Sequence, residues 1–267
     1  MLDNFNQLSD LLTSDEPVSI IRFGNVEVTS LLGKGIYEQM YSNAGFYGDE
    51  KCYQYWKKLY IEALFKCNGI LDVCSCASFQ ICGDLMIKLN CWKPTLPYIE
   101  DPSWWIQLIE EINEPIGVVS FFKKDIEEQI PNLSQIWVRR TLRKKKFNVV
   151  KSWNTITGNK PHKDWNETFE KLKDRVDSQT DTKLWLISCG CYGLPLCEYI
   201  RQKGQKAIYV GGLLQLIFGL KGSRWEDRQE VTRHYNQYWK YPTTKPENYN
   251  SVEGGCYWEK PSEKKLI

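Results

Sequence analysis

The chain has 267 residues, a formal net charge of +2 and 42% hydrophobic residues. This length suits one large α/β domain or two small ones, and no Ser/Gly/Pro-rich linker divides it. We therefore predict one domain over residues 1–258 and a frayed, charged tail over 259–267. The nearly balanced charge argues against nucleic acid as the main partner.

No apolar run reaches the roughly 18 residues that a membrane-spanning helix needs, so we expect no transmembrane segment. The first residues show no secretory signal, which favours a cytoplasmic location. The chain has ten cysteines but no Cys-x-x-Cys pair, and its only histidines are His162 and His234. This spacing favours reduced thiols over a disulfide framework or a zinc site.

The first predicted strand is residues 18–23, which follow an amphipathic helix over residues 3–13. Arg22, Gly24, Asn25 and Glu27 lie at its carboxyl end, where a helix through residue 32 begins. An arginine late in a buried strand needs a partner or a ligand. Glu27 either caps the helix or faces a site, because a helix N-terminus stabilises a carboxylate in both cases.

A helix over residues 50–67 leads to a second strand, 69–73, which contains Asp72. Asp72 either bonds a loop backbone or faces the cleft as a base. A helix over 79–89, a rigid loop over 94–102 and a helix over 104–113 follow. The third strand, 115–122, carries the small polar residue Ser120 near its end, and a helix over 123–129 comes next.

Residues 139–146 are mostly basic and include Arg139 and Arg140. They form either a solvated face or a cationic wall that neutralises a nucleotide diphosphate. A strand over 147–150 and a helix from Asp164 through residue 176 come next.

Residues 183–212 have the pattern of a βαβ unit. Apolar strands end at Ser188 and Val210, and a helical segment lies between them. Glycines follow both strands. Since parallel strands end at one edge of a sheet, we expect the loops there to bind an anionic ligand. The predicted ligand-binding residues in these loops are Gly190, Tyr192, Gly193, Gly211 and Gly212. An apolar helix over 213–220 is expected next.

Tryptophan is unusually frequent, with 11 residues, and several stand in predicted loops or at helix starts. Aromatic rings in such places offer platforms for a flat ring or a sugar face. The predicted acceptor-binding or lid residues are Trp104, Trp105, Trp225, Tyr257 and Trp258. The loop-rich tail after Gly222 also carries Arg224, and we expect it to wrap the domain or close a cleft.

Three segments in this order, 19–27, 188–193 and 207–212, resemble the GT-D-type glycosyltransferases of bacterial glycan clusters and of large algal DNA viruses. The tail segments 222–225 and 253–258 are similar to the same group, so the resemblance spans most of residues 18–258. It implies a single-domain, Rossmann-like α/β fold with a mostly parallel sheet and helices on both faces. The implied activity is sugar transfer from a nucleotide diphosphate sugar, UDP-linked in our prediction, to a hydroxyl of an oligosaccharide or glycoprotein glycan.

The family's Arg-Phe-Gly-Asp-x-Glu motif holds a divalent metal on the diphosphate. This chain has Asn25 at the Asp position and keeps Glu27. An amide is a poorer ligand than a carboxylate for a hard dication. We therefore expect no required cofactor, with Mn²⁺ or Mg²⁺ on Glu27 as the alternative. Arg22, Arg139, Arg140 or Arg224 then supplies the positive charge.

Inverting transfer needs a base for the acceptor hydroxyl, and we predict Asp72 as that base with Glu27 orienting the donor. Two rival interpretations stay open. One is a Rossmann-like methyltransferase or oxidoreductase with an adenine cofactor, although the Gly-x-Gly-x-x-Gly motif is missing. The other is a non-catalytic glycan-binding protein in which the tryptophans bind sugar.

Overall fold

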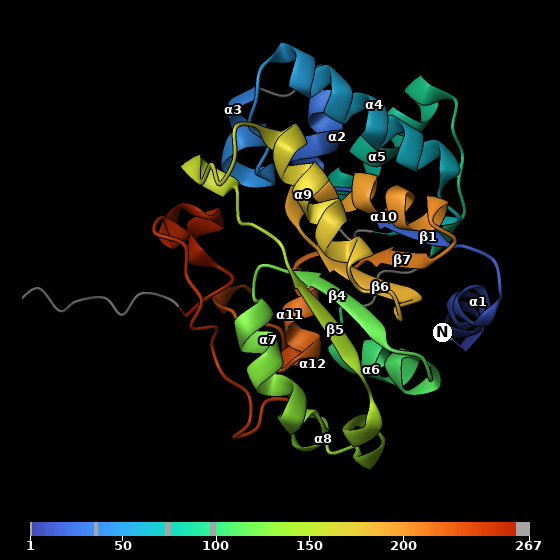
Figure 1. Ribbon diagram of the computed structural model, residues 1–267, viewed down its shortest axis with the longest axis vertical. Coiled ribbons are helices and arrows are strands. Elements are labelled where there is room, and N and C mark those ends of the chain that lie inside the picture. Colours follow the sequence, from blue (N-terminus) through green and yellow to red (C-terminus); the bar gives the residue numbers. More distant parts are fainter. Residues whose placement is uncertain (1, 35–36, 73–75, 97–99, 260–267) are drawn as a thin grey trace, which may run out of the picture.

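The computed structural model describes residues 2–34, 37–72, 76–96 and 100–259. Within them, one parallel sheet of seven strands has the order β3-β2-β1-β7-β6-β4-β5 (Figure 1). The predicted α/β class with a parallel sheet is therefore confirmed. The strands are β1 (Ser19–Arg22), β2 (Gly69–Leu71), β3 (Thr95–Leu96), β4 (Ile116–Ser120), β5 (Phe147–Lys151), β6 (Leu184–Ser188) and β7 (Lys206–Tyr209).

Alternating side chains of the strands build two separate cores, one on each face of the sheet. Ile20 packs into one core and Ile21 into the other, and both are fully buried. Likewise, Leu186 of β6 packs into the same core as Ile20, and Ile187 packs into the same core as Ile21. Successive residues of a strand point to opposite faces, so an uninterrupted apolar run is what a sheet covered on both faces requires.

Helices cover both faces, as Figure 1 shows. The upper layer in that view contains α2 (Asn25–Leu31), α3 (Tyr37–Gln39), α4 (Glu50–Lys66), α5 (Cys76–Leu89), α9 (Trp165–Asp177) and α10 (Gly193–Gln202). The other core is packed by α1 (Leu2–Thr13), α6 (Pro102–Glu111), α7 (Lys123–Gln129), α8 (Leu133–Ile136), α11 (Leu214–Ile217) and α12 (Gln229–Thr232). No helix within the described ranges is long and apolar enough to cross a membrane.

Two elements differ from the sequence prediction. β3 lies inside the predicted rigid loop, because two residues are too few to show a periodic pattern. They still pair with β2, with Thr95 opposite Ile70. The predicted helix over 213–220 is shorter, because Gly219 takes a left-handed φ of +68° that ends the helical path after α11.

Two neighbouring strands send the chain to opposite faces of the sheet. After β4 the chain enters α7, whose Ile126 joins one core, and after β6 it enters α10, whose Leu196 joins the other. Ser120 and Ser188 end these strands and are aligned in register. In open parallel sheets, ligands bind at the carboxyl ends of strands where the chain diverges in this way.

The chain after β7 returns over the ends of the strands and is held there by hydrogen bonds. The buried carboxylate of Asp125 accepts bonds from the backbone N–H groups of Thr243 (2.7 Å) and Thr244 (3.1 Å). The indole of Trp258 donates to the carbonyl of Thr244 at 2.8 Å. These contacts fix residues 243–258, which we call the C-terminal strap, to α7 and to one another.

Candidate active site

A cavity of about 470 Å³ opens at the carboxyl edge of the sheet, the edge at which the strands end. Residues at or just after the ends of β1, β4, β5, β6 and β7 line it, together with the C-terminal strap. Its volume lies within the range of about 300–1,000 Å³ that is typical of small-molecule sites. The parallel topology therefore brings five strand ends into one pocket.

Arg22 ends β1 and lies against Gly211, which follows β7. The two meet because β1 and β7 are neighbours in the sheet. Gly211 has a φ of +72°, and a Cβ atom there would stand 2.7 Å from Nη1 of Arg22. Only glycine takes this backbone conformation without strain and leaves room for the guanidinium.

Glu27 is buried in the same corner, and its carboxylate folds back over the start of α2. A Cβ atom on Gly24, which precedes this helix, would lie 2.0 Å from the Glu27 Oε2. Burial raises the pKa of Glu27, and the nearby Glu253 raises it further, while its backbone hydrogen bond and Arg22 oppose the shift. Glu27 therefore holds a proton more readily than an exposed glutamate.

The C-terminal strap adds a second carboxylate, Glu253, which pairs with a second arginine, Arg224. Arg224 Nη1 donates to Glu253 Oε2 at 2.9 Å and to the hydroxyl of Tyr257 at 3.1 Å. The Tyr257 hydroxyl in turn donates to Glu253 Oε1 at 3.1 Å. The ring of Tyr257 lies against Gly212, where a Cβ atom would stand 2.7 Å from it. This network joins the strap to the loop after β7.

A third arginine, Arg228, also lines the cavity and bonds the carboxylate of Glu100. The described lining thus holds three arginines, Arg22, Arg224 and Arg228, each near a glutamate. Guanidinium groups bind phosphate oxygens through paired hydrogen bonds. An incoming diphosphate would compete with the glutamates for these groups.

The opposite part of the lining is aromatic and polar. Trp153 and Asn154 follow β5, and the guanidinium of Arg175 lies 3.6 Å from the centre of the Trp153 ring. Such stacking holds the indole in one orientation. Asn43, Ser120 and Ser188 add hydrogen-bonding groups. A planar base or a sugar ring would find both stacking area and polar partners here.

The described lining carries carboxylates but no preformed cluster of metal ligands. Among the described residues, no group of three or more His, Cys, Asp or Glu side chains is arranged to hold an ion. Asn25 supplies an amide where a metal site needs a carboxylate, and Glu27 is folded over its own helix. Hard dications require several oxygen ligands, and carboxylates bind them best. The positive charge of the described lining comes from its arginines.

Many of the residues predicted from the sequence meet at this cavity. They are Arg22, Gly24, Asn25, Glu27, Ser120, Gly190, Gly211, Gly212, Arg224, Trp225, Tyr257 and Trp258. Of these, Trp225 and Trp258 are almost completely buried, so they support the lining more than they offer open platforms.

Asp72, the predicted base, is not among the residues that line the cavity. It follows β2, which lies beyond β1 on the flank of the sheet, and its backbone N–H donates to the carbonyl of Leu96 at 2.7 Å. The next residues, 73–75, lie outside the described ranges. Asp72 is therefore not part of the cavity lining, although the preceding residue, Leu71, pairs with Arg22 of β1.

Arg139 and Arg140 stand away from the cavity. They precede β5, so they lie at the amino edge of the sheet, where the strands begin. Arg139 pairs there with Glu110 at the end of α6, at 2.7 Å. The two ends of a strand lie at opposite edges of the sheet. Arg139 and Arg140 are therefore not in the donor site, and their prediction as donor-binding residues is corrected.

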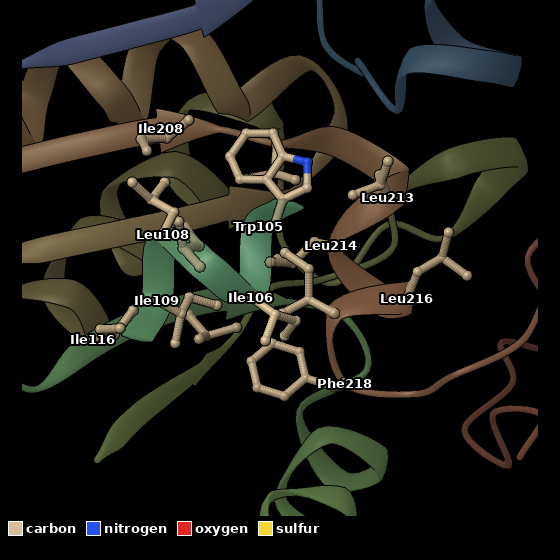
Figure 2. Packing of buried hydrophobic residues seen from close by; sticks show 14 of the residues in the cluster. Trp105, Ile106, Leu108, Ile109, Ile116, Ile208, Leu213, Leu214, Leu216 and Phe218 are labelled. Atoms are coloured by element: carbon tan, nitrogen blue, oxygen red, sulfur yellow. The ribbon is translucent and has the colours of Figure 1, made fainter. Parts of the chain in front are cut away.

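Trp104 and Trp105 belong to α6 and not to a platform loop. Trp105 is fully buried and lies among Ile208, Leu213 and Leu214 (Figure 2). Trp104 is partly buried and packs on the same core. Trp105 is therefore a core residue, which corrects its prediction as an acceptor-binding or lid residue.

Tyr192 and Gly193 are also structural in this fold. Tyr192 is buried and stacks on Trp165, with ring centres 5.1 Å apart. A Cβ atom on Gly193 would stand 2.4 Å from the Tyr209 ring, so this glycine lets α10 approach β7 closely. Neither residue lines the cavity.

The sequence interpretation missed several lining residues. Trp153 and Asn154 follow β5 just as Asn25 follows β1, and the same strand-end rule would have found them. Glu253 stands within one of the tail segments already singled out. Glu100 and Arg228 have no local signal, because only the fold brings them together.

No protein-family model and no curated protein matches the sequence. The fold is similar to solved structures. One is a glycosyltransferase (DUF1792) from Streptococcus sanguinis, at 16% identity and a TM-score of 0.48, with 92% of this chain and 95% of that chain covered. Another, for which the conserved domain of unknown function 1792 is described as a distinct glycosyltransferase fold, has 15% identity and a TM-score of 0.45. It covers 79% of this chain and 81% of that chain. At these levels the likeness identifies neither substrate nor reaction.

Proposed function

We propose that this protein transfers a hexose or pentose from a nucleoside diphosphate sugar to a hydroxyl group of a glycan. The observation that carries the proposal is the charge arrangement of the cavity. Three arginines converge on a space of about 470 Å³ at the carboxyl edge of a parallel sheet. An anion with several oxygen atoms, such as a diphosphate, is the ligand that such an arrangement favours.

Glycosyl transfer builds negative charge on the departing diphosphate. Donors that are already in place stabilise this charge without reorganisation. Arg22 is held between β1 and Gly211, and Arg224 is anchored by Glu253 and Tyr257. We therefore assign the diphosphate to the space between Arg22 and Arg224, and we expect transfer without added metal.

The remaining lining suits the other parts of the donor and the acceptor. Trp153 and Asn154 offer a stacking surface and an amide to a nucleobase, and we propose uridine as the base to test first. Inversion at the sugar needs a carboxylate near the acceptor hydroxyl. Since Asp72 does not line the cavity, the carboxylates to consider are Glu27, Glu100 and Glu253.

The test is a panel of UDP-glucose, UDP-galactose, UDP-xylose and GDP-mannose, assayed for donor hydrolysis and for transfer to oligosaccharides. Each donor is assayed with EDTA and with Mn²⁺. We expect at least one to be turned over in EDTA, and Arg22→Met to lower that turnover by about 100- to 1,000-fold.

Thermal shift with the same donors, S-adenosylmethionine and NAD separates the rival functions. Stabilisation by an adenine cofactor alone would favour a methyltransferase or an oxidoreductase. Binding of an oligosaccharide without any nucleotide would favour a glycan-binding protein. Either result contradicts the proposal.

A further inference from the structure

Glu253 has a backbone conformation that glutamate rarely adopts. Its φ is +48°, in the left-handed region, and the two residues that follow it, Gly254 and Gly255, also have positive φ. A side chain in this region costs roughly 1–2 kcal/mol relative to an ordinary conformation. Strained residues of this kind concentrate at functional sites, where the surrounding contacts hold them in place.

The contacts of Glu253 hold its carboxylate at the cavity. Arg224 donates to one oxygen and Tyr257 to the other, and the Cys256 thiol lies 3.8 Å from Oε2. A carboxylate has about four lone-pair sites, so it can accept a further hydrogen bond. The side chain is one-third exposed (33%), so a substrate hydroxyl can reach it.

The other two carboxylates of the cavity are less well placed to meet an acceptor hydroxyl. Glu27 is folded over the start of α2 and is buried, so a substrate hydroxyl reaches it less easily than it reaches Glu253. Glu100 is exposed to the same extent as Glu253 (33%) and is bonded to Arg228, but it is not among the charged groups that act on Glu27. Glu253 lies close enough to Glu27 to raise the pKa of Glu27, although burial is the larger cause. Glu253 therefore stands near the corner that contains Arg22.

We propose that Glu253 is the catalytic base that removes the proton from the acceptor hydroxyl. This inference rests on the proposed glycosyltransferase function. The hydroxyl proton passes to the Glu253 carboxylate while the hydroxyl oxygen bonds the anomeric carbon. The bond from that carbon to the diphosphate breaks, and its electron pair stays on the diphosphate oxygen beside Arg22. Glu253 then returns the proton to water.

The experiment compares Glu253→Gln with the wild-type protein, using the nucleotide sugar that the wild type turns over in the donor panel. We expect transfer to an oligosaccharide hydroxyl to fall by about 100- to 10,000-fold, the range for loss of a general base. Binding of UDP, measured by calorimetry, should be kept or become tighter, because the glutamine competes less than the glutamate for Arg224. Glu247→Gln makes the same chemical change at an exposed position of the strap and should keep full activity.

An assay with azide as the acceptor distinguishes a catalytic base from a residue that only supports the structure. Azide attacks the anomeric carbon without losing a proton, so it needs no base. With azide as acceptor, Glu253→Gln should form the glycosyl azide at close to the wild-type rate. A matching loss with azide and with the oligosaccharide would overturn the assignment, as would a product of retained anomeric configuration.

Glu253→Gly provides a second variant, whose folding does not require the left-handed backbone at position 253 to accept a glutamine. Glycine adopts the left-handed conformation freely, so this variant should unfold at the same temperature as the wild type or higher. Its hydroxyl transfer should still be lost. Full transfer activity in the glycine variant would refute the proposal, whereas failure of the wild type to turn over any nucleotide sugar would refute the proposed function itself.

Discussion

The two edges of the sheet carry similar charged groups but differ in what surrounds them. At the amino edge, Arg139 pairs with Glu110 on a partly exposed surface. At the carboxyl edge, Arg22 lies near Glu27 inside a cavity, against a glycine with positive φ. An arginine–glutamate pair alone therefore does not mark a site. Strand direction and the space left by glycine decide which pair can meet a ligand.

The largest effect in this comparison should come from removing the arginine at the carboxyl edge, with the arginine at the amino edge as the control. Arg22→Met should lower kcat/KM for the donor by about 100- to 1,000-fold, since one preorganised charge partner of the leaving group is lost. Arg139→Met should leave kcat/KM unchanged, because exposed ion pairs contribute about 0–1 kcal/mol to stability and this one lies far from the cavity. Steady-state kinetics of both variants test the contrast. Equal losses would show that the edges do not differ as described.

A pair of glycines sharpens the same comparison. Gly204 precedes β7 at the amino edge and Gly211 follows it, and their φ angles are +79° and +72°. Alanine at either position should destabilise the fold by about 1–2 kcal/mol through backbone strain, which urea unfolding can measure. At Gly204 nothing lies within 4 Å of the new Cβ, whereas at Gly211 it meets Arg22. UDP binding should therefore weaken in Gly211→Ala alone.

The smallest effect concerns the titration of Glu27. Its pKa is raised in the folded protein, chiefly by burial, above the ordinary value of 4.5. The folded state then holds the proton more tightly than the unfolded chain does, so stability falls as pH rises from 4.5 through the raised value. Glu27→Gln carries no titrating group there. The melting temperature of the variant minus that of the wild type should therefore increase as the pH rises through that interval.

Glu247→Gln, which replaces an exposed glutamate, serves as the control for this titration. Its melting temperature should follow that of the wild type at every pH. A Glu27→Gln difference that stays constant with pH would show that the burial of Glu27 does not affect its protonation.

Much of the fold was open to prediction from local patterns. The apolar runs of β1, β4, β6 and β7 and the periodic faces of α4 and α9 were located within a few residues. Asp49 and Asp164 cap these two helices through side-chain bonds to backbone N–H groups, which reinforces the local signal. Such patterns involve residues close together in the sequence, so they can be recognised without knowledge of the tertiary contacts.

The site was predicted only in part. Arg22, Asn25 and the glycines after β6 and β7 follow from the rule that parallel strands end at one edge. The same rule places Arg139 at the opposite edge, since it precedes a strand. The prediction instead followed the basic composition of that segment and assigned Arg139 to the donor site. Asp72 satisfied the rule and still does not line the cavity, because β2 lies outside the row of neighbouring strands, β1, β7, β6, β4 and β5, whose ends surround it.

The sequence by itself determined every strand except β3, most helices and the glycine-bearing strand ends, because each depends on neighbours within a few residues. The tertiary structure alone decided that β7 lies beside β1, which places Gly211 against Arg22. It also decided that Glu253 stands at the cavity with positive φ. Strand order and the path of the strap depend on contacts between residues far apart in the chain, and no local pattern encodes those contacts.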